Sequence, residues 1–118
     1  MSLDALTGQF ILLTTFRRDA TPVPTTVWFA RSADGIMVPT GSTTGKVKRI
    51  RNNPQVSMVK SSFRGKVKSD VVVFGTARFL EGADVEVARA LLADKYGLQW
   101  RFTGNNADTF IGIAPDAE

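Results

Sequence analysis

Residues 10–40 read FILLTTFRRDATPVPTTVWFARSADGIMVPT, and this stretch decides the class of fold. It contains three runs rich in β-branched and aromatic residues, which favour strands. Turn-forming residues separate the runs, and the pair Asp34-Gly35 before the third run is a strong hairpin signal. The stretch therefore predicts an antiparallel meander of three strands. The expected strands are 10–17, 23–31 and 36–40.

The rest of the chain alternates helical and strand patterns within one expected domain, residues 1–118. A first helix is expected to start at a Thr43 or Thr44 cap and to end before Pro54, because proline restricts the residue that precedes it. Gly75, inside a later strand, suggests a bulge or a close approach of another backbone. The later elements are strands 55–60 and 70–80, a helix from 82–84 to Gly97, and a strand over 109–114. The order βββ-α-ββ-α-β predicts a mainly β, predominantly antiparallel fold: a small barrel with two peripheral helices.

The composition restricts the chemistry that the side chains can perform. The 118 residues include no His and no Cys, with 43% apolar and 22% charged residues. Thiolate nucleophiles, Ser-His-Asp arrangements and the common zinc sites are therefore excluded. Acid-base work would need a strongly shifted Asp, Glu or Lys. Either the protein is not an enzyme, or a bound cofactor supplies its chemistry.

Positive charge is concentrated in the middle of the chain. Residues 35–69 contain eight basic residues and no acidic one, whereas the net charge of the whole chain is only +4. Such a block predicts a phosphorylated or carboxylated partner, although a solvated face is an equally good explanation of a charge run. The basic residues are Lys46, Lys48, Arg49, Arg51, Lys60, Arg64, Lys66 and Lys68.

The segment TGSTTGK, residues 40–46, joins an expected strand to an expected helix. Free N–H groups at a helix start, the helix dipole and nearby hydroxyls together favour an anion. The spacing is not that of a Walker motif. On the helical wheel Lys46 and Arg51 flank the buried arc, whereas Lys48 and Arg49 point largely away from it. Lys46 is therefore the best candidate for a phosphate ligand.

A flat ring system could lie against the second strand, with its chain running toward Lys46. The candidate residues are Thr25, Thr26, Val27 and Trp28. The alternative is that Val27 belongs to the core and that Trp28 makes a dimer contact. Trp100 also has two interpretations: it could pack in the core or cover a cofactor.

Two stretches resemble a known family. Residues 14–58, TTFRRDATPVPTTVWFARSADGIMVPTGSTTGKVKRIRNNPQVSM, and residues 95–101, KYGLQWR, are similar to the pyridoxamine-phosphate-oxidase-like split β-barrel proteins. The specific likeness is to their deazaflavin-dependent branch. There a T-P-V-W-F type strand, an Asp-Gly turn, a strand ending in Thr and the pattern G-K-x-x-R-x-R-x-x-P-x-V follow in this order.

This resemblance implies a homodimer that binds coenzyme F420 in a groove between protomers and transfers a hydride from the reduced deazaflavin to an unidentified organic substrate. It implies no catalytic side chain and no metal. Lys46 would bind the phosphate, with Thr44, Gly45 and Arg49 nearby. The ring would lie on Thr25, Thr26, Val27 and Trp28, with Val38 and Thr40 on the neighbouring strand, and the polyglutamate tail would meet Lys48, Arg51 and Lys60.

Several alternatives stay open at this point. Within the fold, the cofactor could be FMN, or the protein could bind F420 without turning over a substrate. A basic barrel that binds single-stranded nucleic acid is less favoured, because Phe63 is the only aromatic residue in the basic block. Residues 66–68 and 101–107 match the family least and are expected to border the substrate. The start of the chain resembles no signal segment and no apolar run is long enough to span a bilayer, so we expect a cytoplasmic protein without membrane contact.

Overall fold

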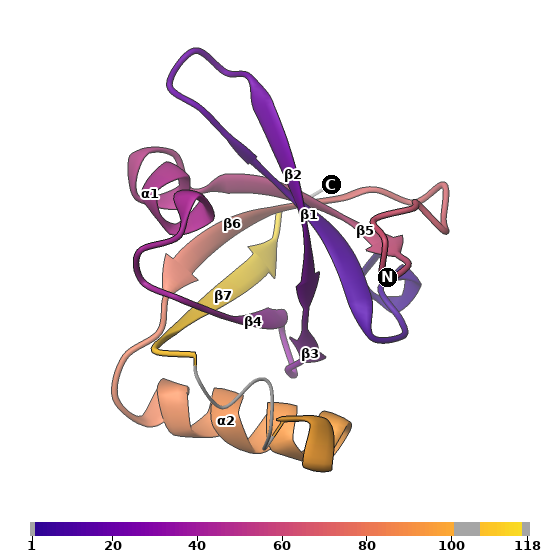
Figure 1. Cartoon of the computed structure of the whole chain (residues 1–118), viewed down its shortest axis with the longest axis vertical. Helices are drawn as coiled ribbons and strands as arrows, with labels where there is room; N and C mark the ends of the chain where they lie inside the picture. Colours follow the sequence, from indigo (N-terminus) through magenta and orange to yellow (C-terminus); the bar gives the residue numbers. More distant parts are fainter. Residues whose placement is uncertain (1, 101–106, 117–118) are drawn as a thin grey trace.

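The computed structural model describes residues 2–100 and 107–116. These residues form seven antiparallel strands in one curled sheet, with the order β2-β1-β5-β6-β7-β4-β3, and two main helices (Figure 1). This is the mainly β barrel with peripheral helices that the sequence predicts. The elements are the 3-10 helix η1 (Ser2–Ala5), β1 (Phe10–Phe16), β2 (Pro22–Trp28), β3 (Ala30–Arg31), β4 (Ile36–Thr40), α1 (Gly45–Asn52), β5 (Gln55–Ser61), β6 (Val73–Phe79), α2 (Ala83–Tyr96) and β7 (Thr109–Pro115).

Most boundaries agree with the sequence patterns. Thr44 is the N-cap residue of α1, and Gly97 ends α2 in the left-handed region with a φ of 56°. The predicted strand over 70–80 is shorter, because only Val73–Phe79 pair with neighbours. A Cβ atom added at Gly75 would lie 2.8 Å from the carbonyl oxygen of Ala114. The close backbone approach expected at Gly75 is therefore present.

The strand expected over 23–31 was wrong as a single element. It divides at Phe29 into β2, which pairs with β1, and β3, which pairs with β4. These two strands are consecutive in sequence but lie at opposite edges of the sheet order. The chain therefore passes from one edge strand of the sheet to the other through a single residue, Phe29. Because the two edges must lie close together for this, the sheet curls into a barrel. Hydrophobic alternation runs on through Phe29, so the sequence pattern does not reveal the change of partner.

Tyr96 satisfies the backbone at this crossing point. Its hydroxyl accepts a hydrogen bond from the Phe29 N–H at 3.1 Å and lies 2.6 Å from the Phe29 carbonyl oxygen and 2.8 Å from that of Gln9. Burial raises the pKa of Tyr96, which keeps the phenol protonated and able to donate. Tyr96 thus bonds the Phe29 N–H in place of a ladder partner, and the ammonium of Lys95, also on α2, donates to the Phe29 carbonyl.

Tyr96→Phe is expected to lower the free energy of unfolding by about 1–3 kcal/mol, because buried backbone groups lose their partner while the ring volume is kept. Urea denaturation followed by fluorescence measures this. Val87→Ala, on an exposed part of α2, is the control and should change stability by no more than about 0.5 kcal/mol. Equal stability of Tyr96→Phe and wild type would contradict the role given to the hydroxyl.

Two apolar clusters hold the fold together. The first fills the barrel interior and includes Ile11, Phe29, Val38 and Met58. The second lies between α2 and the outer surface of β3, β4 and β7, where Ala88, Leu92 and Tyr96 form the buried face of the helix. Figure 1 shows α2 lying across one end of the barrel, at a distance from α1. Among the described residues, no helix is long and apolar enough to cross a bilayer.

Candidate cofactor site

The loop between β4 and α1 is locked by its own hydroxyl groups. The Thr44 Oγ1 donates to the Gly41 carbonyl at 3.0 Å and lies 3.3 Å from the Thr40 Oγ1. The Ser42 N–H and Oγ both donate to Asp108, at 2.7 and 2.9 Å, and these bonds lower the pKa of that carboxyl. Both hydrogen-bond donors of Ser42 are therefore already used within the protein. The donors left for an anion at this end include the first N–H groups of α1, the exposed hydroxyl of Thr43 and the side chain of Lys46.

Arg49 points toward the barrel, so the prediction that it faces away from the buried arc was wrong. Its Nε donates to the Thr15 Oγ1 at 2.6 Å, and its guanidinium lies over Gly45. A Cβ atom on Gly45 would be 2.7 Å from the Arg49 Nη1, so a side chain there would require the end of Arg49 to move. Because Gly45, one helical turn before Arg49, has no side chain, the long side chain of Arg49 can extend back across the helix.

Lys46 and Arg49 form a partly buried pair of positive charges. Burial is the main cause of the lowered pKa of Lys46, and the neighbouring charge of Arg49 lowers it further. Within residues 2–100 and 107–116, the ion pairs are Arg31 with Asp4 and Arg78 with Asp84, and no carboxylate neutralises either Lys46 or Arg49. Two partly buried cations beside a helix start favour an anionic ligand.

Thr15 was missed by the sequence reasoning. It is fully buried on β1, in the same inward phase as Ile11 and Leu13. No sequence signal identifies it, because β1 carries apolar residues in both phases and Thr14 and Thr15 look alike; only the structure shows that Thr15 is buried and needs a partner. That partner is Arg49, which links β1 to α1.

The four candidate ring residues on β2 do not share one face. Thr25 and Val27 face the barrel interior, opposite Leu13 and Ile11, whereas Thr26 and Trp28 face outward. A ring could meet both sets only across the open edge, and β2 is an edge strand in the sheet order. Val27 is almost completely buried, and the indole of Trp28 stacks on Tyr96 with ring centroids 4.6 Å apart.

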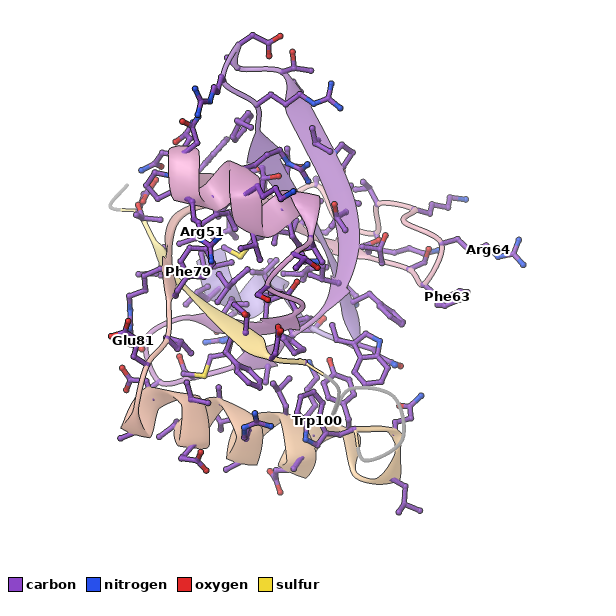
Figure 2. All side chains as sticks on the ribbon, turned by 60° about the vertical axis from the view of Figure 1, so that its left-hand side comes forward. Arg51, Phe63, Arg64, Phe79, Glu81 and Trp100 are labelled. Carbon is purple, nitrogen blue, oxygen red and sulfur yellow. The ribbon has the colours of Figure 1, made fainter. Side chains whose placement is uncertain are left out.

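The other predicted site residues are spread between core and surface. Thr40, beside Thr44, is buried, and Val38 is fully enclosed in the barrel core. Lys48 and Arg51 are exposed on α1, and the guanidinium of Arg51 lies 5.5 Å from the ring centroid of Phe79 (Figure 2). The structure thus brings Thr40, Thr44, Gly45, Lys46 and Arg49 together and leaves Lys48 and Arg51 at the rim.

The two segments assigned to the substrate side differ in what the structure describes. Residues 66–68 belong to a hairpin after β5, in which Val67 bridges to Ser61 and Lys68 donates to the Lys60 carbonyl. Figure 2 shows Phe63 and Arg64 at the projecting tip of this hairpin. The expectation for 101–107 falls almost entirely outside the described residues. Trp100 is buried, with its ring centroid 6.3 Å from that of Phe110, so it packs against the barrel.

Lys95 is a further ionisable group in an unusual setting. Its ammonium donates to the Phe29 carbonyl at 2.8 Å and lies 3.6 Å from the centroid of the Phe29 ring. Burial lowers the pKa of Lys95 to about 8. A lysine in the unfolded chain has a pKa near 10.5. Between pH 8 and pH 10.5, Lys95 is therefore mostly deprotonated in the folded protein and mostly protonated in the unfolded chain.

We expect the contribution of Lys95 to stability to rise with pH above about 8, since deprotonation removes the cost of the partly buried charge in the folded state. Urea unfolding at pH 7 and pH 9.5 should show a larger gain for wild type than for Lys95→Met. Tyr96 is present in both proteins, so its own titration largely cancels in this comparison. Identical pH dependence of the two proteins would contradict the lowered pKa.

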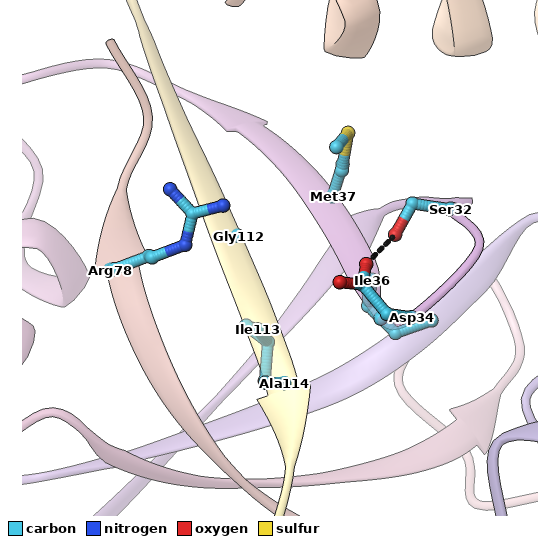
Figure 3. Close-up of a pocket in the computed structure, with 9 residues that line it drawn as sticks. Ser32, Asp34, Ile36, Met37, Arg78, Gly112, Ile113 and Ala114 are labelled. Atoms are coloured by element: carbon cyan, nitrogen blue, oxygen red, sulfur yellow. Dashed lines mark hydrogen bonds between the residues drawn. The ribbon is translucent and has the colours of Figure 1, made fainter. Parts of the chain in front are cut away.

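A separate hollow lies at the β3–β4 turn, away from the residues of α1. Its lining includes Ser32, Asp34, Met37, Arg78 and Gly112 (Figure 3). The Ser32 Oγ donates to Asp34 at 3.3 Å, and Arg78 is paired with Asp84 at 3.4 Å. The charged groups of this hollow are therefore partnered within the chain, which distinguishes it from the Lys46 and Arg49 pair.

The sequence-family comparison covers nearly the whole barrel. Residues 6–115 match the family model described as pyridoxamine 5'-phosphate oxidase. The chain belongs to this pyridoxamine 5'-phosphate oxidase family. The match extends from the residue after η1 to the end of β7, and so includes every strand and both helices described above. No curated protein sequence matches the chain.

Solved structures share the fold of this pyridoxamine 5'-phosphate oxidase family member at low sequence identity. The heme storage protein HutZ from Vibrio cholerae has a TM-score of 0.75 and 14% identity, over 93% of this chain and 83% of that one. A heme-binding protein from Mycobacterium smegmatis has a TM-score of 0.67 and 16% identity, over 94% and 46%. An F420 reductase has a TM-score of 0.66 and 23% identity, over 98% and 93%. Proteins of this shape thus include binders of different cofactors.

Proposed function

We propose that this protein is an oxidoreductase that binds coenzyme F420 and transfers a hydride from the reduced deazaflavin to an organic substrate. The observation that carries the proposal is the pair Lys46 and Arg49, two partly buried cations at the start of α1 without a carboxylate partner among the described residues. A phosphate group of the cofactor would supply the missing negative charge.

The fit of the chain to this cofactor rests on what its own residues can do. Lys46 and the first N–H groups of α1 would bind the phosphate, while Arg49, oriented by Thr15 and Gly45, would supply a second cation. The open edge of β2 would border the ring. When bound, the deazaflavin supplies the hydride, so the absence of His and Cys is no obstacle. The protein would contribute orientation and a water-poor groove.

FMN is the competing cofactor, since it also combines a flat ring with a phosphate. The exposed cations Lys48 and Arg51 on the same helix favour F420, because its tail carries further carboxylates that a second set of positive charges would attract. Lys60 stays a weaker candidate for the tail. Binding of F420 without turnover would use the same residues.

Heme, which two structural neighbours bind, fits this chain poorly. The sequence has no His or Cys to act as an axial ligand, and its single tyrosine is Tyr96. The hydroxyl of Tyr96 is occupied by the backbone of Phe29 and Gln9, and Met58 is fully buried in the barrel. We therefore do not propose that this protein binds heme.

Titration of the purified protein with F420 and, separately, with FMN tests the proposal. We expect F420 to bind at micromolar concentration or tighter and FMN to bind at least tenfold more weakly. Oxidation of reduced F420 in the presence of enones, quinones and tetrapyrroles then tests turnover, which should be accelerated with at least one acceptor. Micromolar FMN binding without any response to F420 would overturn the choice of cofactor. If F420 bound but no acceptor accelerated its oxidation, the protein would be an F420 carrier and not an enzyme. Submicromolar, strongly salt-dependent binding of a single-stranded oligonucleotide would favour the nucleic-acid alternative.

A further inference from the structure

The hairpin after β5 sets two lysines opposite each other. Val67 bridges to Ser61, and the Lys68 N–H donates to the Lys60 carbonyl at 2.9 Å, so this register places Lys68 directly across from Lys60. Lys66, two residues before Lys68, lies on the same face because side chains alternate along an extended chain. We call these three residues the lysine cluster. Like charges directly opposite each other in an antiparallel pair are destabilising, so an anion bound between them would remove a repulsion.

The lysine cluster has no negatively charged partner in the described part of the chain. Both ion pairs of that part involve arginines that lie outside residues 35–69. Residues 35–69 contain no acidic residue, and Arg64 at the hairpin tip adds a further positive charge (Figure 2). Lys66 and Lys68 are exposed, and Lys60 is half-buried. The hairpin therefore presents a group of cations without an internal counterion.

The turn of this hairpin rests on β2. The Gly65 N–H donates to the Ser62 carbonyl at 3.0 Å, and Gly65 has a φ of 82°, which favours glycine. A Cβ atom on Gly65 would lie 2.9 Å from the Thr26 Oγ1, so the turn contacts this strand closely. Lys66 follows Gly65 directly, with its Cα atom about 3.8 Å further along the backbone. Its long side chain can therefore reach a molecule that lies on Thr26, one of the candidate ring residues.

The lysine cluster is too distant from α1 to share the phosphate of the candidate cofactor site. That site includes Arg49, which bonds Thr15 near one end of β1, whereas the hairpin meets Phe10 at the other end through Phe63. Five steps of strand separate Thr15 from Phe10, a distance of roughly 17 Å. Figure 1 shows α1 and the hairpin after β5 on opposite sides of the barrel. The positive charge of the hairpin is therefore left for another anionic group.

We propose that the organic acceptor carries a carboxylate and that the lysine cluster binds it. This inference rests on the proposed function, because the acceptor is the molecule that takes the hydride from the deazaflavin. The contact of Gly65 with Thr26 places the cluster beside the part of β2 proposed to border the ring. The ring of Phe63, 74% exposed at the hairpin tip, offers apolar surface to the rest of the acceptor. The substrate class is thus an apolar or aromatic electrophile with an acidic group.

The lysines act in binding and are not catalytic residues. Reduction of an enone of this class adds a hydride from the reduced deazaflavin to one carbon of the double bond and a proton from water to the other. The deazaflavin is oxidised, the double bond is consumed, and the carboxylate is unchanged. Removal of the lysines should therefore raise the KM for the acceptor and have little effect on kcat.

Isothermal titration calorimetry with acid and ester forms of the same acceptor tests this inference. The probes are 4-carboxychalcone and a naphthoquinone carboxylic acid, each paired with its methyl ester. They are titrated into protein saturated with oxidised F420, which permits no turnover. We expect wild type to bind at least one acid at least tenfold more tightly than its ester, and Lys66→Ala/Lys68→Ala to lose this preference. Arg17→Ala/Arg18→Ala, which removes two exposed cations from the β1–β2 turn, is the matched control and should keep it.

The carboxylates of the F420 tail are the other source of the same chemistry, and titration of each variant with F420 distinguishes the two sources. We expect Lys66→Ala/Lys68→Ala to bind F420 within twofold of wild type. A tenfold loss of F420 affinity in this variant, with the preference for the acid kept, would assign the lysine cluster to the tail and overturn the proposal.

The remaining outcomes separate this proposal from the proposed function. If neither acid bound more tightly than its ester, or if the arginine control lost the preference equally, the carboxylate site would be refuted whatever the affinity for F420. The same titrations are repeated on the cofactor-free protein. If that protein bound no F420 but preferred the acid through the two lysines, the proposed function would fail and the carboxylate site would stand.

Discussion

The double variant Lys46→Ala/Arg49→Ala is expected to bind F420 at least 100-fold more weakly than wild type. In the proposed site each cation would interact with the same phosphate at the start of α1, and the loss of one is expected to cost at least tenfold, or about 1.4 kcal/mol. Both side chains are partly buried, so solvent screens them less than surface charges. Fluorescence titration of F420 against each single variant and the double variant measures the effect.

Lys68→Ala is the control, because Lys68 is an exposed cation on the hairpin after β5. Its F420 affinity should change less than twofold. Thermal unfolding of each variant distinguishes a lost ligand contact from a lost fold, since Arg49 also holds Thr15. If Lys46→Ala and Lys68→Ala weakened binding equally, the basic block would act as a diffuse field and the cluster at α1 would not be the phosphate site.

Gly35→Ala is expected to destabilise the protein by about 3 kcal/mol or more. A Cβ atom at this position would overlap the Ile113 carbonyl oxygen and lie 3.2 Å from its carbon, and both belong to the backbone of β7. Neither atom can move without disturbing the pairing of Ile36 with Ile113 that closes this part of the barrel. Overpacking against a rigid strand is more costly than contact with a flexible side chain. Urea denaturation at 25 °C measures the loss.

Gly41→Ala is the matched substitution, because its Cβ atom would meet the Thr44 side chain at an ordinary 3.6 Å. Its stability should remain within about 1 kcal/mol of wild type. A comparable, small effect of both substitutions would mean that Gly35 serves only the turn between β3 and β4 and that β7 does not approach it closely.

Local patterns predicted the elements well because each depends on neighbours in sequence. The Asp34-Gly35 turn forms between β3 and β4, with a hydrogen bond from Ser32 to the Gly35 carbonyl. Thr44 caps α1, although its hydroxyl bonds to Gly41 and not to the helix. The β-branched and aromatic run FILLTTF forms β1, as its composition predicts. Turn, cap and strand period are short-range effects, so no knowledge of the fold is needed to identify them.

The candidate site was predicted less completely, because its geometry depends on contacts between distant segments. Lys46 could be selected from its place at the start of α1. The inward path of Arg49 could not, because it depends on Thr15, which lies 34 residues away. The division of the strand at Phe29 depends on Tyr96, which lies 67 residues away. Helical periodicity and strand alternation carry no information about such partners.

The sequence by itself determined the class of fold and the order of the elements, and it excluded catalysis by His or Cys side chains, because strand patterns, turn chemistry and the lack of His and Cys are properties of the chain. Only the tertiary structure decided that β2 and β3 lie at opposite edges, that Ser42 is engaged by Asp108, and that Lys46 and Arg49 share a partly buried position without a carboxylate. The physical reason is that burial and charge neutralisation are set by which segments meet in space.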